Sequence, residues 1–236
     1  MTRILALTAV ELEAARLARD LALAPVAGSP WAHFRSGALE VACVGLGASR
    51  LEERAARCAT PALVISAGAC GALSPDLREG QLVVPEAILL ESGARYPTAP
   101  LAGYPRRGTL LTVGRVVESP SAKARLWVET GAVAVDMESA VILEWAQRRG
   151  VPAAVVRGVS DTASRAVPAR VRLGLPAPKD STIVQNQARG VSFLGSRLRK
   201  PLCRASSESS PDFRIPFQWS KYRADLHIEA SVVGSP

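Results

Sequence analysis

The sequence predicts an α/β fold with a mostly parallel sheet. Short apolar segments that suit buried strands alternate along the chain with segments of helical periodicity. Apolar residues make up 48% of the 236 residues, which is enough to build a sizeable core. Helices then pack on a sheet whose ligands bind beyond the carboxyl ends of its strands.

The first elements follow this alternation. Residues 3–8 are predicted as a buried strand and residues 9–23 as a helix. Residues 38–45 form the next strand, residues 48–59 the next helix and residues 61–68 a third strand. The small-residue sequence "AGACGAL" that follows is interpreted as a tight turn, or as a Gly-rich loop whose amides face a ligand.

The middle of the chain is less regular. Residues 80–90 read as a strand, and Pro85 inside it indicates an edge position or a bulge. Residues 92–108, rich in Gly and Pro, are expected to form a loop, and residues 108–114 a strand. Ser119, followed by proline, is a suitable N-cap for the next helix.

Acidic residues follow several of the predicted strands. Residues 133–161, "VAVDMESAVILEWAQRRGVPAAVVRGVSD", predict a strand, a helix and a strand. Glu138 follows the first of these strands and Asp161 the second, while Glu13 follows the strand that begins the chain. Each acid has an ordinary structural explanation: an exposed helix face for Glu13, a first-turn acid for Glu138 and an N-cap for Asp161. Asp136 is expected to be a structural turn or cap residue.

Composition limits the other functions of the chain. The four Cys and two His residues form no C-x-x-C pair and no metal-like spacing, so neither a metal nor a cofactor is expected. Reduced cysteines suit a cytoplasmic protein. We find no core of a secretion signal at the first residues, and no apolar run approaches the ~20 residues of a membrane span.

The net charge of +8 is concentrated near the C-terminus. Residues 166–236 contain 11 of the 29 Lys and Arg residues but only five of the 21 Asp and Glu residues. We therefore divide the chain into a domain, residues 1–165, and an irregular basic tail, residues 166–236. Such a tail suits peripheral contact with anionic membrane lipid. Nucleic acid is not an expected partner, because no aromatic-rich RNA motif or zinc finger is present.

Residues 1–165 resemble the purine nucleoside phosphorylase and nucleosidase superfamily. The resemblance rests on "ALTAVELEAARL", "LVISAGACGALSPDLREGQLVVPEAIL" and the pairing of V-D-M-E-S-A at 135–140 with V-R-x-V-S-D at 156–161. Within the superfamily, "RRGTLLTVGRVVESPSAKARL" is most similar to the hopanoid-associated phosphorylases, also called adenosylhopane nucleosidases.

The resemblance implies a three-layer α/β/α fold and cleavage of the N-glycosidic bond of a purine nucleoside. The implied substrate is a small nucleoside, in the hopanoid branch an adenosine linked to a hopanoid, from which adenine is released. The implied assembly is a homodimer or a higher homo-oligomer.

The resemblance also assigns roles to particular residues. Two acids would carry the chemistry: Asp161 would protonate or hold the N7 side of the purine, and Glu13 would position the attacking water. Four further residues would bind the substrate: Glu138 through the ribose hydroxyls, Met137 against the sugar, Gly68 within the Gly-rich segment, and Val117 near the base.

Hydrolysis is favoured over phosphorolysis. The Gly-Asp-Pro-type turn that holds phosphate in phosphorylases is absent after the first strand, where Glu11 and Glu13 stand instead, and carboxylates repel phosphate. Phosphate as a co-substrate stays open, as does a methylthioadenosine or S-adenosylhomocysteine type of nucleosidase. An inactive nucleoside-binding homologue also stays open, because the family pattern S-D-x-A-D ends here in Ser164 and the tail does not resemble the closing helix.

Overall fold

The computed structural model describes residues 3–167, so nearly all of the predicted tail lies outside the described residues. The division at residue 165 therefore stays a prediction.

The described strands join one mixed sheet. The strands are β1 (Ile4–Thr8), β2 (Ala24–Pro25), β3 (His33–Ser36), β4 (Leu39–Cys43), β5 (Leu63–Ala72), β6 (Leu82–Val83), β7 (Ala87–Leu90), β8 (Arg95–Pro97), β9 (Thr109–Thr112), β10 (Ala134–Asp136) and β11 (Ala153–Asp161). The helices are α1 (Glu11–Asp20), the 3₁₀ turn η1 (Leu46–Ala48), α2 (Leu51–Ala55), α3 (Pro120–Thr130) and α4 (Ser139–Gln147).

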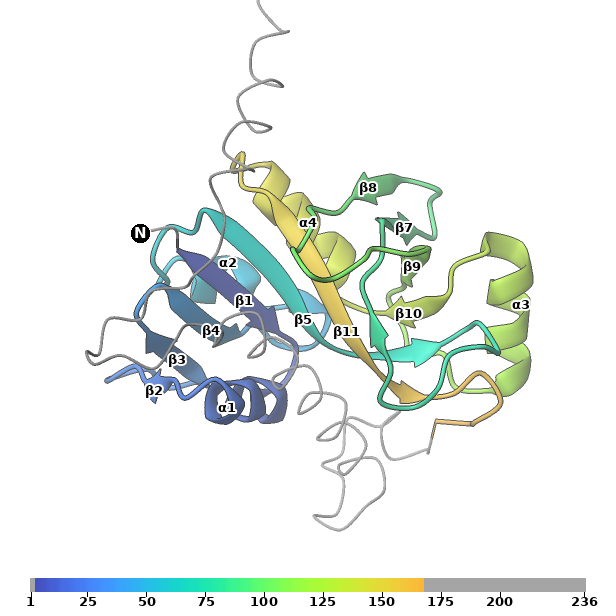
Figure 1. Cartoon of the computed structure of the whole chain (residues 1–236), viewed down its shortest axis with the longest axis horizontal. Coiled ribbons are helices and arrows are strands. Elements are labelled where there is room, and N and C mark those ends of the chain that lie inside the picture. The colour runs from blue at the N-terminus through green and yellow to red at the C-terminus, as the bar shows by residue number, and fades with distance from the viewer. Residues whose placement is uncertain (1–2, 168–236) are drawn as a thin grey trace, which may run out of the picture. The chain divides into compact units, whose positions relative to one another are not determined.

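The long strand β5 is the centre of the sheet. The strand order is β2-β3-β4-β1-β5-β10-β9-β7-β8, and β11 pairs with β5 along its other edge. Figure 1 shows β5 and β11 running side by side through the middle of the molecule. The pairs β1–β4, β1–β5, β5–β11, β9–β10 and β7–β9 are parallel, so the predicted α/β fold with a mixed, mostly parallel sheet is confirmed.

Two strands end facing each other along one edge of β5. β1 runs parallel to β5 and pairs with it as far as Ser66. β10 runs antiparallel to β5 and pairs with it at Gly71 and Ala72. The carboxyl ends of both strands therefore point at the stretch 67–70 of β5. This is a switch point of the kind at which open α/β sheets bind ligands, and it is where the acids after β1 and β10 arrive.

The turn predicted after residue 68 is wrong. β5 continues through Ala72, because β11 pairs with it from Val64 to Gly71 and satisfies its backbone groups. Glycines are needed in this strand for a different reason. A Cβ atom at Gly68 would lie 2.6 Å from Nη1 of Arg157, and one at Gly71 would lie 3.1 Å from a carboxylate oxygen of Asp161.

Other boundaries differ from the sequence predictions in places. Residues 80–90 form two short strands, β6 and β7, and not the single strand predicted; the irregularity expected at Pro85 is the break between them. The expected loop 92–108 contains the short edge strand β8. The helix expected over 48–59 is shorter, because η1 and a turn take up its two ends. Ser119 caps α3 as predicted, and its hydroxyl accepts a hydrogen bond of 3.1 Å from the amide of Ala122.

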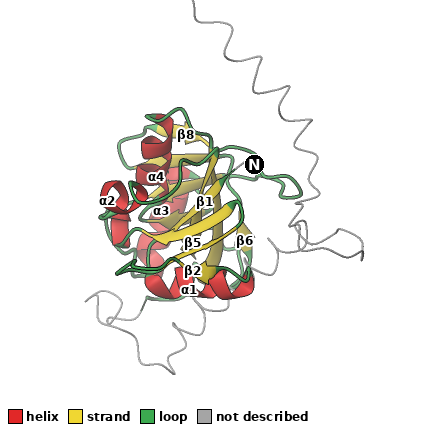
Figure 2. Cartoon of the chain, turned by 90° about the vertical axis from the view of Figure 1, so that its left-hand side faces the viewer, coloured by secondary structure: helices red, strands yellow, loops and turns green. Residues whose placement is uncertain are grey.

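α1 and α4 pack against different strands of the sheet. α1 packs against β1, β3 and β4, whereas α4 packs against β5, β7 and β11. In Figure 2, α2 and α4 lie together on one side of the strands. The apolar faces meet in a core that includes Leu5, Leu7, Val64, Ile142 and Val155, all 1% exposed or less. Burial of this kind stabilises the chain by ~25 cal/mol per Å² of apolar surface.

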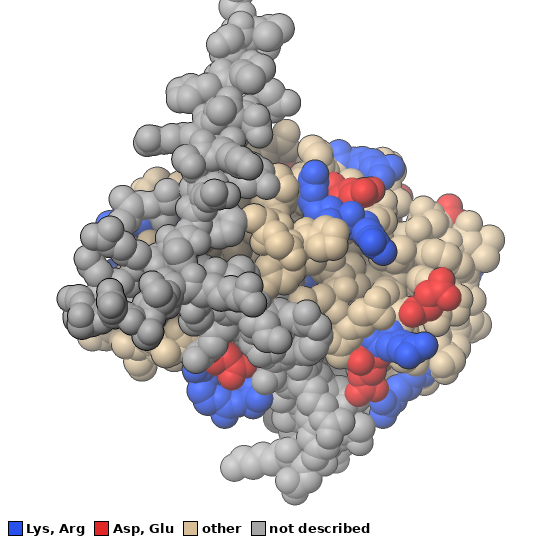
Figure 3. All heavy atoms as spheres, in the orientation of Figure 1, with Lys and Arg blue, Asp and Glu red and all other residues tan. Residues whose placement is uncertain are grey.

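The described residues contain neither a membrane-spanning helix nor, on the face drawn in Figure 3, a single basic patch. No helix among residues 3–167 is long and apolar enough to cross a bilayer. On the face drawn in Figure 3, basic and acidic side chains of the described residues lie next to one another and do not gather into one basic patch. Peripheral membrane contact through the tail stays a prediction.

Candidate active site

A buried arginine lies at the centre of the site. Arg157, in the middle of β11, is 1% exposed. Its Nη2 atom lies 2.7 Å from Oδ2 of Asp136 and donates hydrogen bonds to the hydroxyls of Ser66 at 2.8 Å and Ser139 at 3.0 Å. Burial alone lowers the pKa of Arg157, but the neighbouring carboxylates outweigh burial and raise it, so the guanidinium stays charged.

Asp136 is the structural residue that the sequence indicated. Its Oδ2 accepts the Ser139 amide at 3.2 Å, at the beginning of α4, and also pairs with Arg157. Its Oδ1 accepts the hydroxyl of Thr112 at 2.6 Å. A buried carboxylate needs such partners, because an unpaired buried charge costs several kcal/mol. Asp136 therefore fixes the end of β10 and the orientation of Arg157.

Glu138 lies beside this pair, 5% exposed. Its Oε1 accepts the amide of Gly47 in η1 at 3.0 Å, while its Oε2 lies 3.8 Å from Nη2 of Arg157, too far for a hydrogen bond. Burial raises the pKa of Glu138 to about 7; Arg157 acts against this rise, and Asp136 adds to it. The second oxygen is thus available to accept a hydroxyl hydrogen from a ligand.

Glu13 is the third carboxylate near Arg157. Its carboxylate accepts three backbone amides, those of Ala9 at 3.1 Å, Val10 at 3.2 Å and Ala69 at 2.9 Å. The Ala69 bond ties α1 to the switch point of β5. Burial raises the pKa of Glu13, although Arg157 and the three amides oppose the rise. A Cβ at Gly68 would collide with Oε1 of Glu13 at 2.9 Å, so Gly68 allows this carboxylate to approach Arg157.

Asp161 makes a separate set of contacts at the end of β11. Its Oδ1 accepts the hydroxyl of Ser160 at 2.6 Å, and its Oδ2 pairs with Nζ of Lys123. The Lys123 side chain, on α3, is fully buried and also donates to the carbonyls of Thr162 and Arg165, both at 2.8 Å. The Asp161 side chain is 18% exposed, so a ligand can reach it.

The remaining two predicted residues differ in their surroundings. Met137 is half-buried between Asp136 and Glu138 in the chain. The side chain of Val117 is buried in an apolar cluster with residues such as Leu111 and Val135. Contact of Val117 with a base stays a prediction.

Several residues that contact the candidate site acids were not predicted from the sequence. Arg157 lies within the V-R-x-V-S-D motif, and a single arginine inside the apolar strand "AAVVRGV" indicates a buried charge that needs partners. Ser66 and Ser139 carry no such signal. Lys123 occurs in the helical sequence "SAKARLW", where a lysine is ordinarily exposed, so only the fold reveals its burial.

The mixed sheet and its switch point define an α/β protein of the kind that binds ligands beyond the carboxyl ends of its strands. The chain belongs to the phosphorylase superfamily, whose family model matches residues 3–106 and 104–189. This family match confirms the expectation of an enzyme of the nucleosidase or phosphorylase class. No curated protein sequence matches the chain significantly.

Solved structures share this fold. The apo 5'-methylthioadenosine nucleosidase of Arabidopsis thaliana is 16% identical with a TM-score of 0.66, covering 85% of this chain and 94% of its own. The futalosine hydrolase of Helicobacter pylori is 20% identical with a TM-score of 0.62, covering 84% and 97%. A Helicobacter pylori methylthioadenosine nucleosidase variant with methylthioadenosine in its active site is 18% identical with a TM-score of 0.64, covering 84% and 99%. These likenesses confirm the predicted α/β/α fold of the nucleoside phosphorylase type.

Replacement of Lys123 by methionine should destabilise the protein. The change leaves Asp161 without its buried cation and two carbonyls without their donor, which costs about 1–3 kcal/mol. Denaturant unfolding measures the free energy. Arg125→Met is the matched control, because Arg125 lies on the same helix and its ion pair with Glu129 is exposed. Equal unfolding midpoints for Lys123→Met and the wild type would contradict the structural role of Lys123.

Glu138 should make stability fall as pH rises. Its pKa in the folded protein, about 7, exceeds its ordinary value of 4.5, so between these values the native state holds a proton that the unfolded state has released. The free energy of unfolding therefore decreases as pH rises from about 4.5 to 7, by on the order of 2 kcal/mol from this group.

Unfolding of the wild type and of Glu138→Gln across this pH range measures the effect. Glu138→Gln should lose this decrease in stability with pH, whereas Glu144→Gln, at an exposed position on α4, the helix that Glu138 precedes, should keep it. Identical pH profiles for the wild type and Glu138→Gln would show that the Glu138 pKa is not raised.

Proposed function

We propose that the protein cleaves the N-glycosidic bond of a purine nucleoside by hydrolysis and releases the base. The observation that carries this proposal is the buried cluster in which Glu13 and Glu138 flank the Arg157 guanidinium at the switch point of β5. It combines an acceptor for sugar hydroxyls with a carboxylate that can activate water. Asp161, at the end of the same strand as Arg157, supplies an acid for the leaving base.

Glu138 suits the ribose. The Gly47 amide fixes one carboxylate oxygen, which leaves the other free to accept a hydroxyl hydrogen. A carboxylate in this position accepts hydrogen bonds from the vicinal diol of ribose. These hydrogen bonds become stronger as the sugar gains positive charge during bond cleavage. Met137 would then pack against the sugar from the same turn.

Glu13 suits water better than phosphate as the attacking group. Its raised pKa makes it a stronger base toward a water proton. Phosphate would have to enter a cluster in which Glu13, Asp136 and Glu138 face one guanidinium, and Arg157 already pairs with Asp136. The excess of carboxylates opposes a second anion, which supports hydrolysis over phosphorolysis.

Asp161 suits the leaving base. Cleavage expels an anionic purine unless a proton reaches N7, and an acid at this point typically contributes about 10²–10⁴-fold to the rate. Ser160 and Lys123 orient the two oxygens of Asp161. The proton reaches N7 from solvent through Asp161, whose 18% exposed carboxylate takes it up and passes it to the base, while the Lys123 ammonium stays paired with Oδ2 and orients the group.

For the substrate we propose a hopanoid-linked adenosine, on the resemblance of residues 106–126 to the hopanoid-associated phosphorylases. One exposed apolar side chain supports a long apolar substituent on the ribose. Leu46, 57% exposed, precedes Gly47, whose amide donates to Glu138. A methylthioadenosine-type substrate is the second candidate, favoured by the shared fold with methylthioadenosine nucleosidases.

Measurement of free adenine tests this function. The protein should release adenine from adenosylhopane faster than from methylthioadenosine, and added phosphate should not change the rate. The second product should be the free sugar. Phosphate-dependent release with a sugar 1-phosphate would establish phosphorolysis instead. Nucleoside binding without release of adenine would identify an inactive homologue.

The Asp161→Asn variant should lose about 10²–10⁴-fold in turnover while it stays folded, because asparagine cannot deliver a proton. Asp76→Asn is the matched control, since Asp76 is exposed on the loop after β5. Far-ultraviolet circular dichroism verifies the fold of both variants. Unchanged turnover of Asp161→Asn would remove Asp161 from the mechanism.

A further inference from the structure

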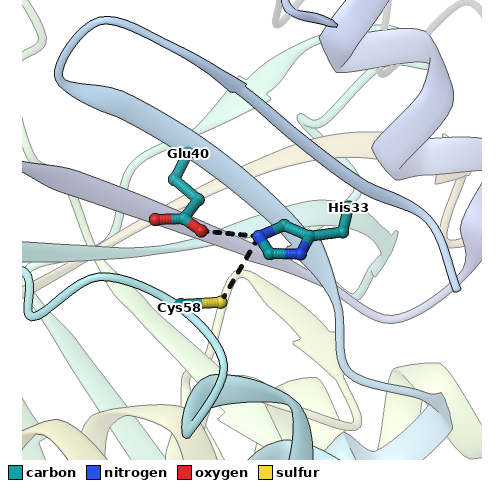
Figure 4. A group of neighbouring side chains, drawn as sticks. All are labelled: His33, Glu40 and Cys58. Atoms are coloured by element: carbon teal, nitrogen blue, oxygen red, sulfur yellow. Dashed lines mark hydrogen bonds and ion pairs between the residues drawn. The ribbon is translucent and has the colours of Figure 1, made fainter. Parts of the chain in front are cut away.

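Three side chains away from the candidate active site meet in a small cluster. His33 lies on β3, Glu40 on β4 and Cys58 in the turn that follows α2. Figure 4 shows the three side chains pointing toward one another. His33 and Glu40 are each 4% exposed, and Cys58 is half-buried. The proposed reaction uses none of them, so their meeting needs another explanation.

The ligand atoms of this cluster are close to the positions that a zinc ion requires. Nε2 of His33 lies 2.5 Å from Oε1 of Glu40 and 3.8 Å from Sγ of Cys58, and all three atoms lie within 4.8 Å of one another. Zn²⁺ takes N and O ligands at ~2.0–2.2 Å and S at ~2.3 Å, which separates tetrahedral ligands by about 3.3–3.6 Å. Shifts of less than about 1 Å would thus place a metal between the three atoms.

Surrounding residues already orient two of the ligands. Arg35 donates to Oε1 of Glu40 at 2.6 Å, and the Ala59 amide donates to its Oε2 at 3.1 Å. Burial raises the pKa of Glu40, but the hydrogen bonds from Arg35 and His33 outweigh burial and lower it, so the carboxylate is ionised. The His33 ring stacks on Trp31 with 4.5 Å between ring centres. Partners of this kind hold metal ligands in place in other proteins.

The protonation of the Cys58 thiol favours a metal site over a reactive cysteine. Burial, and next the charge of Glu40, raise the pKa of Cys58 to about 12. A thiol in this state is a poor nucleophile and a poor redox sensor, because the thiolate is the reactive form. A bound divalent cation reverses this preference, since it displaces the proton from sulfur and compensates the new charge.

We propose that His33, Glu40 and Cys58 bind one Zn²⁺ ion. The imidazole, carboxylate and thiolate form a borderline-soft set that suits Zn²⁺ and not Mg²⁺ or Ca²⁺. Binding forms metal bonds to Nε2, Oε1 and Sγ and releases the thiol proton, and any proton on Nε2, to solvent. Arg35 and Glu40 also line a cavity of about 50 Å³, which has room for water beside the carboxylate.

The position of the site links it to the active site. Glu40 and Cys58 bracket residues 41–57, which include η1 and the Gly47 amide that binds Glu138. A metal bound at both ends of this segment would brace the chain that holds Glu138. Zinc binding itself does not depend on the proposed reaction, and its test reads out metal coordination and not turnover.

Titration of the full-length protein with Co²⁺ tests the proposal. Cobalt is a spectroscopic substitute for zinc, and bonding to Cys58 should produce a thiolate-to-cobalt charge-transfer band in the near ultraviolet. Zn²⁺ should abolish the band by competition. Cys58→Ala should lack the band, whereas Cys43→Ala and Cys203→Ala, which remove other thiols, should keep it. Absence of the band in the wild type, or its survival in Cys58→Ala, would overturn the proposal.

A second measurement needs no variant and so does not depend on whether a variant folds. Zn²⁺ should slow the alkylation of Cys58 in the wild-type protein, as peptide mass spectrometry measures, and should leave the alkylation of Cys43 unchanged. Equal alkylation of Cys58 with and without Zn²⁺ would mean that His33 and Glu40 form an internal ion pair only.

Discussion

The ion pair between Arg157 and Asp136 is the interaction on which the rest of the site depends. Both side chains are almost fully buried, and a buried charge without a partner costs several kcal/mol. The pair joins β11 to the end of β10, and the Ser139 amide extends it to the beginning of α4. Glu13 and Glu138 also point their carboxylates toward this pair. Without the positive guanidinium of Arg157, these carboxylates and that of Asp136 would repel one another.

Topology explains why these groups meet. β1 and β10 approach β5 from opposite directions and end opposite each other, so the chain after β1 delivers Glu13 and the chain after β10 delivers Asp136 and Glu138 to one point. β11 brings Arg157 to the same point from the other edge. Gly68 leaves the room that the charged side chains occupy. The same geometry separates Glu138 from Asp161, which lies farther along β11 beside Gly71.

Part of this arrangement was predictable from the sequence. Alternating apolar segments predicted the sheet, and the acids after strands gave Glu13, Glu138 and Asp161 as candidate site residues. Strand direction was not predictable: the sequence suggested that parallel strands bring the acids together, whereas β10 runs antiparallel to β5. Neither the burial of Lys123 nor the meeting of His33, Glu40 and Cys58 has a local signal, because both depend on contacts between segments distant in the chain. The small residues after Gly68 suggested a turn, since nothing local shows that β11 will pair with them.

The most direct test is a double-mutant cycle between Arg157 and Asp136, with the free energy of unfolding as the measured quantity. Arg157→Met should lose about 3–5 kcal/mol, because it leaves buried carboxylates without their cation. Addition of Asp136→Asn should recover part of this loss, so the two changes together should cost less than the sum of each alone. Additive losses, or an Arg157→Met variant as stable as the wild type, would contradict the view that this ion pair holds the site together.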